Sequence, residues 1–148
     1  MILFLDFDGV PHPFFPRRDI SDEENQLFAY LPRLEATLRD FPHVRIVISS
    51  DWRQRMSLDD IRQYFSSDMR PRVIGVTPSF PLADDWIGCR HREALAWLMD
   101  TSQADVPWVA LDDLQENWQP DAPLILCDDG FRGTEETALR DALASLKR

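Results

Sequence analysis

Five short apolar runs recur along the chain, and a polar side chain follows each of them. Runs this short and rich in β-branched residues are typical of strands that are buried on both faces of a sheet. The runs are Ile2–Leu5, Val44–Ile48, Val73–Val76, Val109–Leu111 and Leu124–Cys127, and the residues that follow them are Asp6, Ser49, Thr77, Asp112 and Asp128. Because segments with helical spacing lie between the runs, we predict an α/β fold with helices on both faces of a central parallel sheet of about five strands.

The helical segments carry start signals. Ser21 and Glu24 have the spacing of a capping box, but Pro32 interrupts the segment that follows and predicts a break or a second start there. A last helix is predicted to begin at Thr134. Another is predicted over residues 93–99, with three apolar side chains facing the core: Leu95, Leu98 and Met99.

Length and composition narrow the class of protein. A chain of 148 residues has the length of about one domain, so residues 1–148 are expected to form a single domain. No apolar run approaches the roughly 20 residues of a transmembrane helix, and the first residues lack the basic region of a signal peptide. Cys89 and Cys127 form no CxxC pair, so we expect reduced thiols and a cytoplasmic protein. The net charge of −10 argues against general coating of nucleic acid, although a local basic groove is compatible with it.

The most informative motif ends the first run, where Asp6 and Asp8 precede Gly9. Continued strand geometry would send these two side chains to the same face, and the glycine would let the chain turn and expose N–H groups to an anion. The carboxylates would repel a phosphate bound beside them, by about 1 kcal/mol per charge pair at 4 Å in water and about 4 at an effective dielectric of 20. A divalent cation is therefore expected, and oxygen ligands favour Mg²⁺.

Four motifs, in this order, resemble those of the haloacid dehalogenase (HAD) superfamily. They are DFDG with Asp6 and Asp8, Ser49 after the second run, Arg90 or Arg92 at the start of a helix, and Asp112 with Asp113. A narrower resemblance covers most of the chain: DFDGV, ISSDWR, GVTP, residues 90–98 and LDD are similar to the small HAD domains of Swiss-army-knife RNA-repair proteins and their stand-alone relatives. The resemblance implies a Rossmann-like domain, and the segments between the motifs are too short for a large cap domain.

The resemblance also implies an activity, which is that of a Mg²⁺-dependent phosphatase acting on a phosphate monoester through an aspartyl-phosphate. Asp6 would be the nucleophile, and Asp8 would be the general acid and then the general base. Ser49 would donate a hydrogen bond to the phosphoryl group, and Arg90 would neutralise its charge. The implied metal ligands are Asp6, the Asp8 carbonyl, and Asp112 or Asp113. The substrate class favoured by the resemblance is a nucleotide or a nucleic-acid end.

Neighbouring residues compete for these roles. Ser50 competes with Ser49, and Arg92 competes with Arg90. Asp-Asp occurs four times, but only Asp112–Asp113 and the pair that begins at Asp128 follow buried runs. The candidates for substrate contact are Gly9, Ser50, Arg53 and Arg92, joined by His12 beyond the first motif and Trp86 at the entrance. Trp52 is expected to pack, and Arg17, Arg18, Arg53 and Arg55 are candidates for a basic lip.

Two further functions fit the same residues. One is a low-turnover module that binds a phospholigand or regulates another protein while keeping the site. The other is an accessory component of a nucleic-acid repair system, working beside a kinase or ligase encoded elsewhere, because the sequence has no kinase P-loop. A response-regulator receiver is disfavoured, because receivers carry the phospho-acceptor on the third strand. Phospholigand binding without hydrolysis would separate the first of these from a phosphatase.

Overall fold

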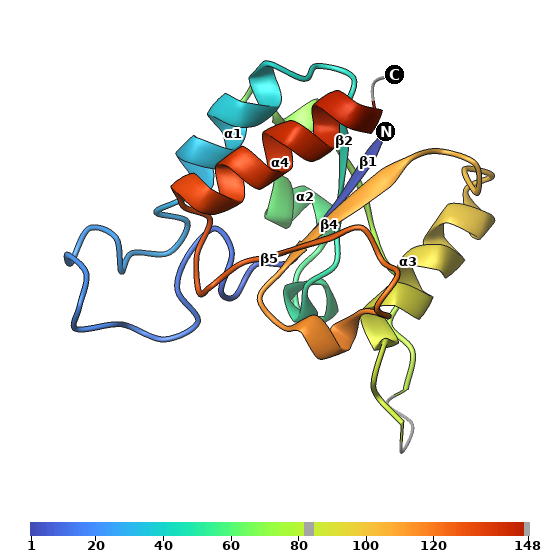
Figure 1. Ribbon diagram of the computed structural model, residues 1–148, viewed down its shortest axis with the longest axis horizontal. Coiled ribbons are helices and arrows are strands. Elements are labelled where there is room, and N and C mark those ends of the chain that lie inside the picture. The colour runs from blue at the N-terminus through green and yellow to red at the C-terminus, as the bar shows by residue number, and fades with distance from the viewer. Residues whose placement is uncertain (82–84, 147–148) are drawn as a thin grey trace.

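Five parallel strands form one sheet in the computed structural model, which describes residues 1–81 and 85–146. Across the sheet the strands lie in the order β3-β2-β1-β4-β5, and every neighbouring pair is parallel. Their bounds are Ile2–Leu5 (β1), Arg45–Ile48 (β2), Val73–Val76 (β3), Trp108–Asp112 (β4) and Leu124–Leu126 (β5). The predicted α/β architecture is confirmed, and β1 lies at the centre of the sheet (Figure 1).

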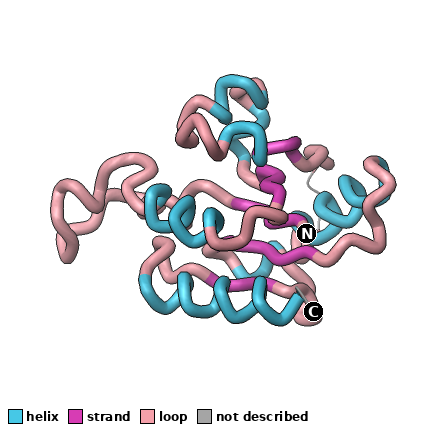
Figure 2. Tube along the Cα trace, turned by 90° about the horizontal axis from the view of Figure 1, so that it is seen from above, coloured by secondary structure: helices cyan, strands magenta, loops and turns pink. Residues whose placement is uncertain are grey.

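Helices cover both faces of the sheet, as predicted (Figure 2). One face carries α1 (Leu31–Arg39), α2 (Leu58–Arg62) and α4 (Gly133–Leu146), and the other carries α3 (Cys89–Asp100). Within β1, Leu3 and Leu5 pack on the first face while Ile2 and Phe4 pack on the second. Because successive side chains of a strand point to opposite faces, burial on both sides explains why the strand reads as an unbroken apolar run.

The first helix begins later than the capping box. Ser21 and Glu24 form the expected hydrogen bonds with one another, but only turns follow them. The helix α1 begins at Leu31 with Pro32 in its first turn, so the second start that Pro32 indicated is the one the chain uses.

The inner face of α3 differs from the prediction. Leu98 is buried, but Leu95 and Met99 are 45% and 69% exposed, so the prediction that they face the core was wrong. A helix repeats every 3.6 residues, and the side that includes Leu98 also carries Ala94 and Trp97. These smaller and aromatic side chains cover the sheet, and the two apolar residues that were expected there point away from it.

The sheet register brings the polar residues after the strands to one edge. Leu5 pairs with Ile48 of β2 and with Leu111 of β4. The N–H of Asp6 donates to the Leu111 carbonyl at 3.0 Å, and the N–H of Ser49 donates to the Leu5 carbonyl at 2.9 Å. Among the described residues, the connections between β1 and β3 hold turns and short helices without a large cap, and no helix has the length and apolarity needed to cross a membrane.

Candidate active site

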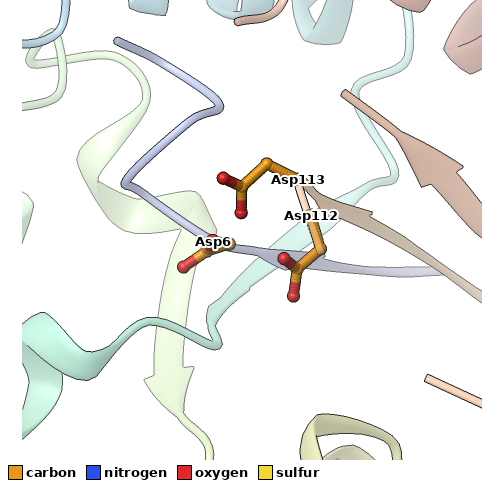
Figure 3. Close-up of side chains that lie close together, drawn as sticks. All are labelled: Asp6, Asp112 and Asp113. Carbon is orange, nitrogen blue, oxygen red and sulfur yellow. The ribbon is translucent and has the colours of Figure 1, made fainter. Parts of the chain in front are cut away.

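Three aspartates lie together where β1 and β4 end (Figure 3). Asp6 follows β1, Asp112 is the last residue of β4, and Asp113 comes next. One carboxylate oxygen from each lies within 4.8 Å of the other two. Because β1 and β4 are neighbours in the sheet, strand pairing holds these residues, called the acid cluster below, at this distance. Carboxylate oxygens at this spacing are the hard ligands that Mg²⁺ prefers.

Burial and mutual repulsion make Asp6 and Asp113 costly to ionise. Burial raises the pKa of Asp6 well above its usual range, and the charges of Asp112 and Asp113 raise it further, while Arg90 opposes them. Burial and the neighbouring Asp112 raise the pKa of Asp113 to about 7. A divalent cation among these oxygens would offset the repulsion, so the donor set fits Mg²⁺.

Asp112 is fixed by three N–H donors although it is fully buried. Its carboxylate accepts hydrogen bonds from the Leu114 backbone at 3.0 Å, from Asn117 Nδ2 at 3.2 Å and from Trp118 Nε1 at 2.9 Å. Donors of this kind hold the orientation of the carboxylate. The loop after β4 therefore positions one member of the acid cluster.

Gly9 leaves room for Asp113. Its φ is +83°, and a Cβ at this position would lie 2.2 Å from Asp113 Oδ2. The backbone N–H of Gly9 donates to the His12 carbonyl at 2.9 Å. This amide is engaged within the turn, because the turn closes on itself through this bond. The exposure of other N–H groups of the loop to an anion, and contact of Gly9 with a substrate, stay predictions.

Asp8 lies beside the acid cluster, and its carboxylate contacts two ring nitrogens. His12 Nε2 lies 3.0 Å from Oδ1, and Trp52 Nε1 donates to Oδ2 at 3.2 Å. Since His12 Nδ1 accepts the backbone N–H of Phe28 at 3.1 Å, the proton of the neutral ring is on Nε2, which donates to Asp8. Both carboxylate oxygens are thus oriented, and Trp52 contacts Asp8 as well as packing in an aromatic group with Phe28.

The two serines after β2 have different surroundings. Ser49 is fully buried, and within the part of the chain that the structure describes its Oγ has no hydrogen-bond partner. Ser50 Oγ accepts the backbone N–H of Trp52 at 3.3 Å and caps the 3₁₀ turn Asp51–Gln54. The predicted role of Ser50 in substrate binding therefore competes with a capping bond, whereas the Ser49 hydroxyl is an unpaired donor.

Arg90 lies near the acid cluster and is braced by two acids. Its Nη1 donates to Glu93 Oε1 at 3.1 Å, and its Nη2 donates to Asp51 Oδ1 at 2.6 Å. Burial lowers the pKa of Arg90, but the contact with Asp51 outweighs it and raises this pKa. The charge of Arg90 in turn limits the rise in the pKa of Asp6. The guanidinium is thus a fixed positive charge beside the nucleophile candidate.

Arg53, a candidate for phosphate contact, has a side chain that is only 2% exposed. Its three nitrogens donate to the carbonyls of Thr77, Ser50 and Pro78, and Nη2 also contacts Glu93 Oε2 at 2.8 Å. Direct contact with a substrate would require these bonds to break. The same burial removes Arg53 from the expected basic lip.

The remaining candidates are drawn into local contacts. Arg92 donates to the backbone carbonyls of Ile87 at 2.7 Å and Asp85 at 3.2 Å, so it holds the loop before α3. Asp128 is not a member of the acid cluster found among the described residues. Arg17 is paired with Asp19, and a basic lip formed by Arg17, Arg18 and Arg55 stays a prediction.

Sequence reasoning missed three residues that shape the site: Asp51, Glu93 and Asn117. Asp51 and Glu93 hold Arg90, and Asn117 holds Asp112. The spacing of Arg90 and Glu93, three apart on a predicted helix, was a signal for the first of these pairs. Nothing local indicated Asn117, because its role depends on how the loop after β4 turns back.

The geometry can be compared with known protein families. A search of curated proteins found no match. The family model of the HAD domain in Swiss Army Knife RNA repair proteins matches residues 2–137, which includes the acid cluster, Ser49 and Arg90. The chain therefore belongs to the family of HAD domains in Swiss Army Knife RNA repair proteins.

Proposed function

We propose that the protein is a Mg²⁺-dependent phosphatase that hydrolyses a phosphate monoester through an aspartyl-phosphate on Asp6. The observation that carries the proposal is the acid cluster at the carboxyl edge of the sheet, with Arg90 beside Asp6. Family membership supports a phosphatase-like activity of the HAD type. The family's description favours a nucleotide or a nucleic-acid end as the substrate class.

In the first step, a carboxylate oxygen of Asp6 attacks phosphorus, and the bond from phosphorus to the alcohol oxygen breaks. Asp8 donates a proton to that oxygen, so the alcohol leaves neutral. Arg90 stabilises the charge on the transferring group, and Ser49 donates a hydrogen bond to it. Because the Ser49 hydroxyl is buried, this contact requires the hydroxyl to become accessible to the phosphoryl group.

In the second step, Asp8 takes a proton from water as the water attacks phosphorus. The bond from phosphorus to Asp6 breaks, which releases inorganic phosphate and restores both carboxyl groups. His12 and Trp52 keep the Asp8 carboxylate in one orientation for both proton transfers.

Asp6, Asp112, Asp113 and the backbone carbonyl of Asp8 would hold the metal ion. When bound, Mg²⁺ supplies positive charge that lets an anionic carboxylate approach an anionic phosphate. The side chains contribute the rest: Asp112 is immobilised by its N–H donors, and Gly9 leaves the space that Asp113 occupies.

The test is hydrolysis of an aryl phosphate with and without Mg²⁺, by the wild type, Asp6→Asn and Asp128→Asn. Asp128→Asn is the matched control, because Asp128 follows the neighbouring strand β5 and lies outside the acid cluster. We expect metal-dependent release that Asp6→Asn abolishes and Asp128→Asn keeps. Full activity in Asp6→Asn, or release that survives chelation, would refute the mechanism. Phospholigand binding without any release would favour the low-turnover module instead.

A further inference from the structure

A cavity of about 320 Å³ lies beside the acid cluster, and part of its wall is aromatic. Phe80 and Trp86 line it and are 48% and 41% exposed, so both rings are accessible to a ligand. Leu114 adds a further exposed apolar side chain. The volume is at the lower end of the roughly 300–1,000 Å³ of small-molecule sites.

Two residues that line the cavity also interact with the acid cluster. Arg90 lines the cavity and also acts on the charge of Asp6. Asn117 lines it as well and donates to Asp112 in the acid cluster. A phosphate placed between Asp6 and Arg90 would therefore have its organic group at the mouth of the cavity.

The aromatic wall is anchored to α3 by charged side chains. The backbone N–H of Phe80 donates to Glu93 Oε2 at 3.1 Å, and Glu93 is itself held by the buried Arg53. Arg92 donates to the carbonyls on both sides of Trp86, those of Asp85 and Ile87. The two rings are exposed although their backbone is tied down, which is the arrangement expected of a built binding surface.

We propose that this cavity binds the organic group of the substrate, and that this group is a planar aromatic ring which stacks on Trp86 and Phe80. The proposal rests on the proposed function, since it takes the phosphate to be held at Asp6. Offset or edge contacts between aromatic rings add to the affinity gained from burial alone, so a flat ring is preferred over a saturated ring of the same size. Arg92 is then a positioning residue for the wall rather than a phosphate ligand.

The experiment measures binding to the Asp6→Asn protein with Mg²⁺ present, so that it does not depend on turnover. The probes are phenyl phosphate and cyclohexyl phosphate, which differ in aromaticity and little in size. The variants are Trp86→Ala, Trp86→Phe and the control Phe15→Ala, whose ring is exposed on the loop after β1 and does not line the cavity. Because Trp86 is partly exposed, its replacement should leave the fold intact, which thermal melting checks.

We expect phenyl phosphate to bind more tightly than cyclohexyl phosphate. Trp86→Ala should lower the affinity for phenyl phosphate by about 5-fold or more, and Trp86→Phe and Phe15→Ala should largely keep it. Equal affinity for the two probes, or no loss in Trp86→Ala, would overturn the proposal. If a nucleoside monophosphate binds more tightly than phenyl phosphate, the preferred ring is heteroaromatic. If phenyl phosphate binds more tightly, the preferred ring is carbocyclic. Either result supports the proposal that the cavity binds an aromatic ring. Hydrolysis of a small alkyl phosphate by the wild type tests the proposed function separately.

Discussion

Replacing Ser49 with alanine should raise stability or leave it unchanged while it lowers activity. The Ser49 hydroxyl is buried and has no partner among the described residues. A buried polar group without a hydrogen bond costs about 1–3 kcal/mol, so its removal relieves a penalty. We expect the free energy of unfolding to rise by up to about 1 kcal/mol, which for a domain of this size raises Tm by about 2–4 °C.

The same change should slow the reaction. A hydrogen bond to a charged group contributes about 1.5–3 kcal/mol, which corresponds to a loss of roughly 10- to 150-fold in kcat/KM for Ser49→Ala. Steady-state hydrolysis of an aryl phosphate measures the loss, and urea denaturation measures stability. The matched control is Ser50→Ala, which removes a capping bond to the Trp52 N–H and should cost about 0.5–2 kcal/mol. A Ser49→Ala protein that is destabilised by more than about 1 kcal/mol, or that keeps wild-type activity, would refute this reasoning.

Three further predictions concern the neighbouring residues. Gly9→Ala should destabilise the protein by about 1–2 kcal/mol and weaken Mg²⁺ binding, because the added Cβ would meet Asp113. Urea denaturation measures the loss of stability, and the Mg²⁺-induced shift of Tm measures metal binding. Unaltered metal binding would contradict the prediction. Trp52→Phe keeps an aromatic ring but removes the N–H that orients Asp8. The kcat should therefore fall by about tenfold with an alkyl phosphate, and less with p-nitrophenyl phosphate, whose leaving group needs no proton. Equal losses with the two substrates would argue against this role of Trp52. Because folding raises the pKa of Asp113 from 3.8 to about 7, its contribution to stability is full below pH 4 and is lost as pH rises through 7. In the presence of a chelator, the Tm of the wild type should therefore fall as the pH rises from 5 to 8. The fall should be smaller with Mg²⁺ present and smaller in Asp113→Asn. A fall of the same size in Asp113→Asn would assign the effect to other groups.

The sequence was sufficient for the sheet and for the shared edge of polar residues, because both follow from local patterns and one general rule. The choice of Asp6 with Asp112 or Asp113 as metal ligands came from the resemblance to the HAD motifs. Each apolar run could be read by itself, and parallel strands place the residues after them at one edge. The burial of the Arg53 side chain could not be predicted from such local patterns. Its burial depends on Glu93, forty residues away in the sequence, and on carbonyls of the loop after β3.

The sequence pattern also gives no sign of which side chains form hydrogen bonds across the edge of the sheet. The bond from Trp52 to Asp8 joins the turn after β2 to the turn after β1, and no periodicity indicates it. The exposure of Leu95 and Met99 reflects which side of α3 meets the sheet, and this is set by packing of Trp97 and Ala94 rather than by hydrophobicity alone. Patterns therefore predicted which elements form, and tertiary contacts decided what their side chains do.

The central position of β1 has a consequence for how the chain folds. Leu3 pairs with Ile46 on one side and with Val109 on the other, so the middle of the sheet is completed by two distant segments. Pairings between residues so far apart in sequence lower the folding rate, because a long loop must close before the contact stabilises it. During synthesis, β1 is made before β4 and finds its second neighbour only after β4 has emerged. Until then one edge of β1 stays open, and Asp6 lacks its partners Asp112 and Asp113.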